Sequence, residues 1–392
     1  MTRIPFEDRL EFLLDELFGR KDIFSAVMGV SSGNGDLRWI GARGEASPGG
    51  RPMTAETPFF IASVTKLYLA VIVMRMVEEG ELALGDRMVD RLPASLTRGI
   101  HVQGGTDFTD RITLEHLLAH ASGLPDFIED YPARGTGVED RRSLVEILLV
   151  EGDRNWSLED TARRVREDLQ PHFPPQELAA KKVRIRYSDT NYQLLRGIIQ
   201  EVRRSSFAEA LSELVLEPLG LHRTWVPGDE RADRPEVPVA ALHSGDELVR
   251  FPSFFSSIAD LEGTADDLLR FLEALTRGEL FRDPRTWPRM QARWNRFSQP
   301  LDRAALRQPS WPIEYGLGVM RFQLPRFLTP FRPIPPVVGH TGSTGVWLFH
   351  APELDLHLVG ALSQITAGPV PFRFVPKVLR AALETRHEAP AG

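Results

Sequence analysis

The pattern of apolar and polar positions predicts strands near both ends of the chain and helices through its middle. Phe24–Val30 and Leu37–Ala42 are strand-like, and the Gly- and Asn-containing turn between them predicts a β-hairpin. Further strand patterns follow near the C-terminus, at 316–323, 337–339, 346–350 and 356–362. Apolar residues at helical spacing predict two terminal helices, at 5–19 and 372–383.

Helical periodicity and capping pairs dominate the middle of the chain, at 113–120, 143–150, 157–169, 191–202, 206–216 and 264–275. Strands from the two ends can share one sheet, with the helical segment inserted between them. We therefore predict an α+β fold in a single catalytic domain, 1–392, with a mostly antiparallel sheet of about five strands. An α/β subdomain is expected from about 1–90 and 260–392, and a mostly helical one from about 91–259.

Two long connecting segments interrupt this pattern. The acid-free run Phe322–Val338 is rich in Pro and Phe, which predicts an exposed or semi-ordered loop. The passage 126–182 is long enough to act as a wall or lid over a site, with Phe127 and Trp156 as candidate contacts; a peripheral decoration is the alternative.

One further helix carries candidate chemistry. Ser63 and Lys66 stand three residues apart at the start of the segment SVTKLYLAVIVMRMV, so one helical turn places both side chains on the same face. From Leu67 to Val77 the helix is apolar nearly all round, which is typical of a buried helix. Burial lowers the pKa of a lysine, so the amine could help to take a proton from the serine. A capping serine beside a snorkelling lysine would produce the same pattern.

Composition narrows the function classes. The 392 residues have 42% hydrophobic and 26% charged content, as in globular proteins, and a net charge of −7 argues against nucleic acid as partner. There is no cysteine, which excludes disulfides, thiolate metal sites and a cysteine nucleophile. No apolar run reaches transmembrane length, so no membrane partner is expected. The acidic, amphipathic N-terminus does not resemble a secretory signal, which predicts a cytoplasmic location for the chain as given; a removed leader is left open.

Two later segments carry polar residues suited to the same site as Ser63 and Lys66. One is Tyr187-Ser188-Asp189, and a tyrosine near a lysine can serve as a base or as a proton shuttle. The other is His340-Thr341-Gly342-Ser343, which lies between two strand patterns. Its glycine allows close approach of the backbone to a ligand, and backbone N–H groups there could hold an oxyanion with the N–H of Ser63.

With these residues in place, the chain resembles the serine β-lactamase-related family, which includes class C β-lactamases, D,D-peptidases, D-aminopeptidases and family VIII-type esterases. The similarity covers about residues 20–385 and extends to ITLEHLLAHASGLPDF, YSDTNYQLLRGIIQEV, GTADDLLRF, YGLGVM and GHTGSTG, all in the expected order. The branch with tyrosine in the second motif is the better match.

The resemblance implies a role for each matching residue. Ser63 is the acylated nucleophile, Lys66 its partner in proton transfer, and Tyr187 a second general acid or base. Backbone N–H groups of Ser63 and Ser343 form the oxyanion hole. Asp189, His340, Thr341 and Gly342 contact the substrate, a small-molecule ester, amide or peptide, and no cofactor or metal is needed. Oligomeric state is left open.

Two departures from the family pattern bear on the substrate. Asp189 stands where the family usually has Asn, and a carboxylate cannot donate a hydrogen bond to a substrate carbonyl. If Asp189 is ionised and close, it keeps Lys66 charged, and Tyr187 becomes the favoured base. His340 replaces the usual Lys of β-lactamases and would anchor a substrate carboxylate less firmly. Both changes argue against an efficient β-lactamase and fit an esterase or a peptidase better.

Several alternatives stay open beside the esterase. A D-amino-acid peptidase or amidase, a weak β-lactamase and a transacylase would use the same machinery, and a non-catalytic penicillin-binding-like interaction module is the alternative of another class. Gly29-x-Ser31-x-Gly33 matches a hydrolase elbow, but a second strand follows it where that motif needs a helix. His116 and His120 are four apart, yet no Glu follows His116, so the H-E-x-x-H zinc pattern is absent. The family resemblance implies a structural role for His120.

Overall fold

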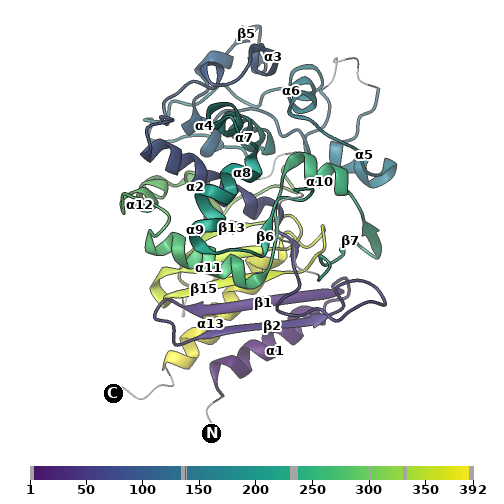
Figure 1. The fold of residues 1–392 in the computed structure, drawn as a ribbon, viewed down its shortest axis with the longest axis vertical. Coiled ribbons are helices and arrows are strands. Elements are labelled where there is room, and N and C mark those ends of the chain that lie inside the picture. Colours follow the sequence, from purple (N-terminus) through teal and green to yellow (C-terminus); the bar gives the residue numbers. More distant parts are fainter. Residues whose placement is uncertain are drawn as a thin grey trace.

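A computed structural model describes residues 4–133, 137, 139–229, 237–299, 302–329 and 333–387. Its centre is an eight-stranded sheet in which every neighbouring pair is antiparallel. The strands follow one another across the sheet in the order β10 (Asn295–Arg296), β11 (Glu314–Tyr315), β12 (Met320–Phe322), β13 (Val337–Thr341), β14 (Trp347–Ala351), β15 (Leu356–Ala361), β1 (Ser25–Ser32) and β2 (Arg38–Gly44). Strands from both ends of the chain thus share one sheet, as predicted, and the predicted α+β class is confirmed (Figure 1).

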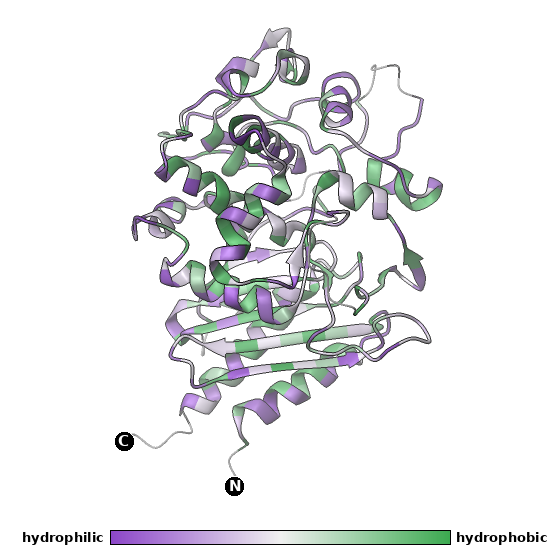
Figure 2. Cartoon of the chain, in the orientation of Figure 1, coloured by the Kyte–Doolittle hydropathy of each residue, from purple (hydrophilic) through white to green (hydrophobic). Residues whose placement is uncertain are grey.

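Helices cover both faces of this sheet. The terminal helices α1 (Phe6–Phe18) and α13 (Val370–His387) pack together on one face, and α11 (Ala265–Arg277) packs against β1, β14 and β15 on the other (Figure 1). Apolar and polar residues alternate along α1, as expected for a helix with one buried face (Figure 2). The sheet is therefore buried on both sides, and side chains of both alternating sets can be inaccessible to water.

The remaining helices lie on the same side of the sheet as α11 but farther from it (Figure 1). Among them is α2 (Thr65–Glu78). From Thr65 to Met74 every residue of α2 is buried, as its apolar sequence predicts. Next to α2 lies α7 (Asp189–Arg203). The other helices are α3 (Ala94–Thr97), α4 (Leu114–Leu118), α5 (Leu144–Glu151), α6 (Leu158–Glu167), α8 (Phe207–Leu211), α9 (Glu217–Leu219), α10 (Pro252–Ile258) and α12 (Thr286–Met290).

Short strands form three smaller sheets. The first has the order β3 (Phe59–Phe60), β9 (Glu262–Gly263), β6 (Thr224–Trp225). Its strand β3 lies just before Ser63 in the chain. The other two are the pairs β4 (Val102–Gln103) with β5 (Thr106–Asp107), and β7 (Leu242–Ser244) with β8 (Glu247–Val249). No helix in the described ranges is long and apolar enough to cross a membrane.

Three expectations are corrected by the structure. The sheet has eight strands, because the two-residue strands β10 and β11 were not predicted; 316–323 contains only β12, and a turn with Gly318 at φ +74° separates β11 from β12. The loop 322–338 is only partly exposed, since Ile334 is 3% exposed and Phe327 71%; residues 330–332 lie outside the described part.

The third correction concerns the passage 126–182, of which 134–136 and 138 are outside the described residues. Phe127 and Trp156 are buried and their rings stack at 6.0 Å. The Trp156 indole donates to the Thr161 hydroxyl at 2.9 Å. Both residues are therefore core residues of the helical part.

Candidate active site

Ser63 lies in a 3₁₀ turn, Ala62–Val64, that leads directly into α2. Ala62 adopts φ +47°, an uncommon conformation for a residue with a side chain, and this turns the backbone sharply just before Ser63. Lys66 follows in the first turn of α2 and is only 3% exposed, whereas Ser63 is half-buried. The Lys66 ammonium donates to Ser63 Oγ at 3.1 Å. The spacing of three therefore places the two groups in contact, as the sequence predicts.

Asp189 begins α7 and is the second partner of Lys66. Its Oδ1 accepts a hydrogen bond from Lys66 Nζ, and the two form an ion pair. The Asp189 side chain is 18% exposed, so the carboxylate also reaches the solvent-accessible side of the site. One ammonium thus connects a hydroxyl on one helix to a carboxylate on another.

The charge of Lys66 follows from these neighbours. Burial acts to lower its pKa, but the negative charges of Asp189 and Asp260 outweigh burial and raise the pKa well above its usual value. Lys66 is therefore held as an ammonium at neutral pH. Desolvation alone predicts the opposite direction, whereas the expectation that a nearby Asp189 carboxylate keeps Lys66 charged agrees with this geometry.

Tyr187 lies beside Lys66, whose Nζ is 5.2 Å from the centre of its ring. The hydroxyl is buried and has no well-formed hydrogen bond within the described structure, although Ser63 and Lys66 are its polar neighbours. Burial raises the pKa of Tyr187 strongly, and the opposing effect of Lys66 is too small to cancel it. Tyr187 is thus a neutral phenol, suited to donate a proton.

The Tyr187-Ser188-Asp189 segment is held in place by the turn that follows α4. His120, at φ +54°, accepts the Ser188 N–H on its Nδ1 at 3.2 Å, and its ring lies 4.4 Å from that of Tyr187. The Ser188 hydroxyl donates to Pro125 O at 2.9 Å. His120 is fully buried, and its contact with the Ser188 N–H supports the backbone of the second motif.

Asp126 fixes the first residue of α7. Its Oδ2 accepts the Asp189 N–H at 3.1 Å, and its Oδ1 accepts the N–H groups of Ile128 at 2.8 Å and Glu129 at 3.1 Å. These partners can only donate, so the hydrogen bonds favour the ionised carboxylate, whereas burial and the charge of Asp189 raise the pKa of Asp126. Several carboxyl groups consequently gather around the start of α7.

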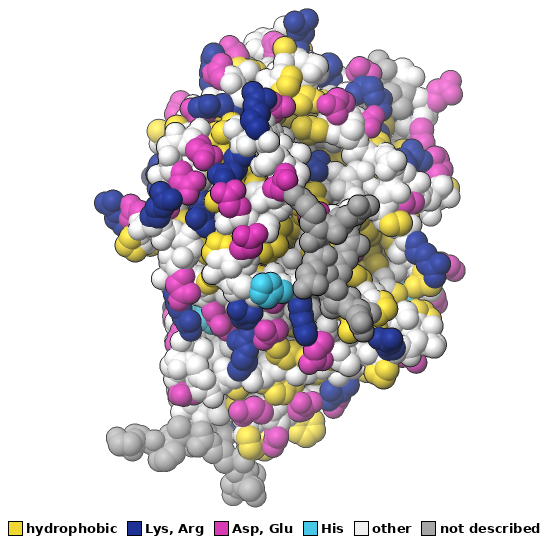
Figure 3. All heavy atoms as spheres, in the orientation of Figure 1, with side chains coloured by type: hydrophobic (Ala, Val, Ile, Leu, Met, Phe, Trp, Pro, Cys, Tyr) yellow, Lys and Arg dark blue, Asp and Glu magenta, His cyan; other side chains and the backbone are white. Residues whose placement is uncertain are grey.

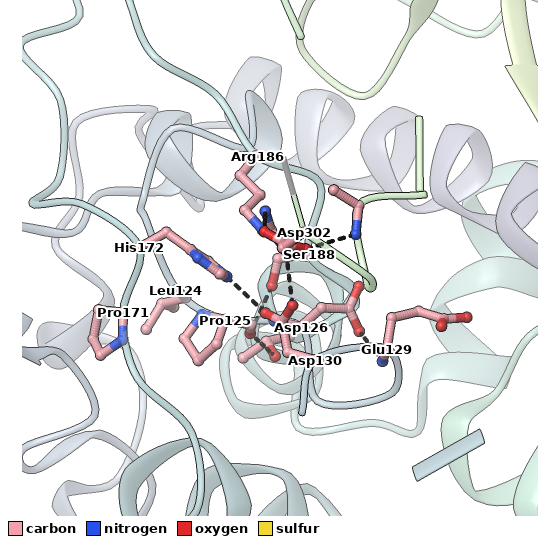
Figure 4. A network of polar contacts seen from close by, with 12 residues as sticks. Leu124, Pro125, Asp126, Glu129, Asp130, Pro171, His172, Arg186, Ser188 and Asp302 are labelled. Atoms are coloured by element: carbon pink, nitrogen blue, oxygen red, sulfur yellow. Dashed lines mark hydrogen bonds and ion pairs between the residues drawn. The ribbon is translucent and has the colours of Figure 1, made fainter. Parts of the chain in front are cut away.

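Arg186, just before Tyr187, anchors the same segment from its other end. Its guanidinium lies between Asp130, at 2.9 Å, and Asp302, at 2.7 Å, and His172 completes the network by contacting Asp130 at 2.7 Å (Figure 4). The network ties the 124–130 turn, the second motif and the 302–308 segment together. It gives Tyr187 a rigid support at a distance from the nucleophile.

The third motif approaches Ser63 from the sheet. Gly342 follows β13, and a Cβ on it would lie 2.9 Å from Ala62 Cβ and 3.4 Å from Ser63 N, so only glycine fits there. Ser343 comes next and is exposed. The backbone at Gly342, which immediately precedes Ser343, is thus brought close to the N–H of Ser63.

The other two residues of this motif point away from an open site. His340 is fully buried; its Nδ1 contacts Thr341 O at 2.7 Å, and because a carbonyl only accepts, Nδ1 carries the proton. Its Nε2 therefore accepts from the Tyr315 hydroxyl at 2.9 Å. Burial lowers the pKa of His340 to about 3, so the ring is neutral and both its nitrogens are engaged. The Thr341 hydroxyl faces Met320 Sδ at 3.7 Å. This geometry favours supporting roles for both residues over the substrate contacts expected from sequence.

The sequence analysis assigned no role to Asp126, Tyr315 or Asp260. Asp126 and Tyr315 fall inside two of the segments that carry the resemblance, ITLEHLLAHASGLPDF and YGLGVM. Asp260, whose charge acts on Lys66, lies in no such segment. The match to G-x-S-x-G at residues 29–33 is the end of β1 and its hairpin turn, as the second strand indicated.

Acidic and basic side chains are interspersed over the face drawn in Figure 3, without a continuous basic region. The molecular surface on this side therefore offers no electrostatic footprint for a nucleic acid.

The fold and the site together define a hydrolase of the serine β-lactamase fold. The sequence model of the Beta-lactamase family matches residues 13–381, and the chain belongs to this family. Esterase EstB from Burkholderia gladioli is 29% identical over 343 residues, which cover 80% of this chain and 79% of that protein.

Two solved structures share the fold. D-amino acid amidase from Ochrobactrum anthropi SV3, complexed with L-phenylalanine amide, aligns with a TM-score of 0.71 at 20% identity over 97% of this chain and 99% of its own. EstCE1, described as a hydrolase with promiscuous acyltransferase activity, aligns with a TM-score of 0.71 at 21% identity over 96% of this chain and 98% of its own.

Proposed function

We propose that this protein is a carboxylesterase that acts through an acyl-enzyme on Ser63. The main observation behind the proposal is the position of Lys66 in the buried first turn of α2. Its ammonium contacts both Ser63 Oγ and the Asp189 carboxylate. If Ser63 only capped α2, there would be no need for the buried Lys66 ammonium to contact both this half-exposed serine and Asp189 on α7. The similarity to Esterase EstB supports the ester as substrate.

The geometry suggests a route for the proton. Ser63 Oγ attacks the acyl carbonyl while its proton passes to Lys66 Nζ, and Lys66 releases another proton to Asp189 Oδ1. Lys66 remains an ammonium and Asp189 becomes a carboxylic acid, so charge and protons balance. The tetrahedral oxyanion is held by the N–H groups of Ser63 and Ser343. As the acyl–oxygen bond breaks, Tyr187 donates its proton to the leaving alkoxide and takes one from Lys66, which regains a proton from Asp189 Oδ1, so that all three groups return to their starting protonation states.

This route revises the expectation that Tyr187 is the base whenever Asp189 is ionised and close to Lys66. Both Lys66 and Tyr187 have raised pKa values, so neither is a free base at rest. The proton acceptor must then be a group that is already ionised, and Asp189 is the carboxylate in contact with Lys66. Tyr187 keeps the role of acid.

The residues around Ser63 favour neutral or cationic substrates over penicillins. The Asp189 carboxylate repels an anionic substrate and cannot donate to an acylamino group. His340 is neutral and buried, so it offers no positive charge to a substrate carboxylate. The same negative charge is compatible with a substrate ammonium, which makes a D-amino-acid amide or peptide the second candidate.

Intact-mass spectrometry tests the proposal. After incubation with a fluorophosphonate, the wild-type protein should gain one adduct and Ser63→Ala should gain none. Ser343→Ala is the matched control, because its backbone N–H is retained; it should still be labelled. An adduct that persists on Ser63→Ala would contradict the assignment, and a wild-type protein that stays unlabelled would favour the non-catalytic interaction module.

The substrate class needs a separate measurement. A panel of p-nitrophenyl esters, D- and L-aminoacyl anilides and nitrocefin should give the highest kcat/KM for an ester. Faster turnover of a D-aminoacyl anilide would select the amidase, and faster turnover of nitrocefin would refute both.

A further inference from the structure

A small polar pocket lies behind Lys66, on the side away from Ser63. It is lined by Thr65, Lys66, Leu69, Ile128, Asp189, Tyr192, Gln193, Arg196, Ile258, Ala259 and Asp260. The centre of a water molecule can reach about 10 Å³ inside it. This is close to the minimum for one water, and four charged side chains supply the polar partners that such a water needs. Two of these side chains, Asp260 and Arg196, have no part in the route proposed above.

The backbone holds Asp260 at this pocket through specific contacts. Ala259 ends α10 at φ +56°, a conformation in which glycine is usual and alanine is strained. The turn is fixed on both sides: Gln193 donates to Ile258 O at 2.9 Å, and Leu261 N–H donates to the Thr65 hydroxyl at 2.8 Å. Both of these side chains belong to helices that carry the proposed catalytic groups. The position of Asp260 relative to Lys66 is therefore well defined.

Arg196 faces the pocket from α7. Its Nε is buried and lacks a hydrogen-bond partner, and Asp260 is the carboxylate whose charge it feels. The Asp260 carboxyl likewise makes no direct hydrogen bond or ion pair with another residue in the described ranges. Two opposite charges thus face a space that fits one water, without touching each other. Arg196 and Asp260 are each partly exposed, but the Arg196 Nε atom is buried, and a buried donor without a partner is costly unless a water or a ligand bridges it.

We propose that Asp260 is a positioning residue for Lys66, acting by its charge and through one water molecule shared with Arg196. The inference rests on the proposed function, because it concerns the lysine that serves Ser63. Asp260 holds the ammonium charged and adds a second negative group behind it, so that Asp189 is not its only counter-ion. The positive charge of Arg196 partly offsets the negative charge of Asp260, and so limits how far Asp260 raises the pKa of Lys66.

The sign of each change can be worked out from the groups that face Asp260. These are Lys66 on α2, and Asp189 and Arg196 on α7. Burial raises the pKa of Asp260 to about 6, against the lowering effect of Lys66, so its carboxylate is ionised above about that pH. Removing this negative charge lowers the pKa of Lys66. Removing the positive charge of Arg196 raises it. A purely structural role would not give shifts of opposite sign.

Two variants, Asp260→Asn and Arg196→Gln, test the proposal, with the exposed Asp266→Asn on α11 as control. We expect Asp260→Asn to shift the alkaline limb of the pH profile of kcat/KM downward by roughly one unit, and Arg196→Gln to shift it upward. The ¹⁵N resonance of Lys66 gives the same pKa without any turnover. The assignment is practical because the chain has only five lysines.

The outcomes separate this inference from the proposed function. Opposite shifts of the Lys66 titration in the two variants, with Asp266→Asn unchanged, support the inference even if the substrate is not an ester. Unchanged titration in both variants overturns it, whatever the fluorophosphonate result. If a variant is unstable, Asp260→Glu keeps the charge and should restore the wild-type titration; failure of this rescue also counts against the inference.

Discussion

The two sides of the site differ in the charges of their side chains. We call β13 and the loop that follows it the sheet wall, and α2, α7 and the end of α10 the helical wall. On the sheet side, His340 of β13 is neutral, fully buried and hydrogen-bonded at both nitrogens. On the helical side, α7 begins with the Asp189 carboxylate, and Asp126 and Asp260 lie near it. The sheet wall supplies shape and backbone N–H groups, whereas the helical wall supplies the electrostatics.

This difference explains why the pKa values of Lys66 and His340 move in opposite directions at similar depth. His340 is buried beside Lys66 without a carboxylate partner, so desolvation lowers its pKa. Lys66 is buried against Asp189, and the ion pair outweighs desolvation. Burial alone therefore does not determine whether a basic group near Ser63 is charged. The presence or absence of a carboxylate next to that group does.

Replacing Lys66 by Met should have the largest effect. The relay between Ser63 and Asp189 is lost, and we expect kcat/KM for esters to fall by roughly 10²–10⁴-fold. Steady-state kinetics with a p-nitrophenyl ester measure the change, with Lys181→Met as control. A kcat/KM within about tenfold of wild type would show that the proton of Ser63 does not pass through Lys66 to Asp189.

Replacing Tyr187 by Phe should have an effect that depends on the leaving group. Because nitrophenolate leaves without protonation, a p-nitrophenyl ester should be affected little, whereas an alkyl ester should lose about 10²-fold in kcat/KM. Tyr315→Phe is the matched control, since its hydroxyl contacts His340 and not Ser63. Equal losses for both esters would remove Tyr187 from the role of acid.

Replacing Asp189 by Asn should change the preference between substrates. The variant loses the proposed proton acceptor, so both reactions should slow down. It also loses a negative charge and gains a donor, so penicillin acylation should improve relative to cleavage of a small neutral ester by about tenfold. The ratio of the two kcat/KM values is the measurement, because a general loss of stability cancels in it. An unchanged ratio would mean that the Asp189 carboxylate does not meet the substrate.

Replacing His340 by Gln should affect the pH dependence of stability more than catalysis. The folded-state pKa of His340, about 3, is below the usual value for histidine, so its contribution is present above about pH 6.5 and is lost as pH falls toward 3. The variant should therefore lose less stability than wild type over this window in denaturant titrations. A parallel loss in both proteins would indicate that His340 is accessible and protonated.

The sequence predicted the parts of the site that depend on short spacing. The three residues from Ser63 to Lys66, and the order of the three motifs, follow from local periodicity, and α2 has the burial that its apolar run implies. The strands of the two chain ends were found for the same reason. The hairpin of β11 and β12 was not, because two- and three-residue strands leave almost no alternation to detect.

The electrostatics could be predicted only conditionally: a nearby Asp189 keeps Lys66 charged, but the sequence does not show whether the two side chains meet. The direction of the Lys66 pKa depends on Asp189 and Asp260, which are 123 and 194 positions away in the chain, and only the packing of α2 against α7 and the end of α10 brings them together. Likewise, His340 and Thr341 point to opposite faces of β13, yet both are buried because helices cover both faces of the sheet.

The titration of the Lys66 side chain tests the contrast between the two walls most directly. In wild-type protein with ¹⁵N-labelled lysine, the Lys66 resonance should remain that of an ammonium above the pH at which the exposed Lys181 titrates. It should titrate at lower pH in Asp189→Asn and be nearly unchanged in His340→Gln. A Lys66 that titrates below Lys181 in the wild type would contradict the account, because the helical wall would then not hold its charge.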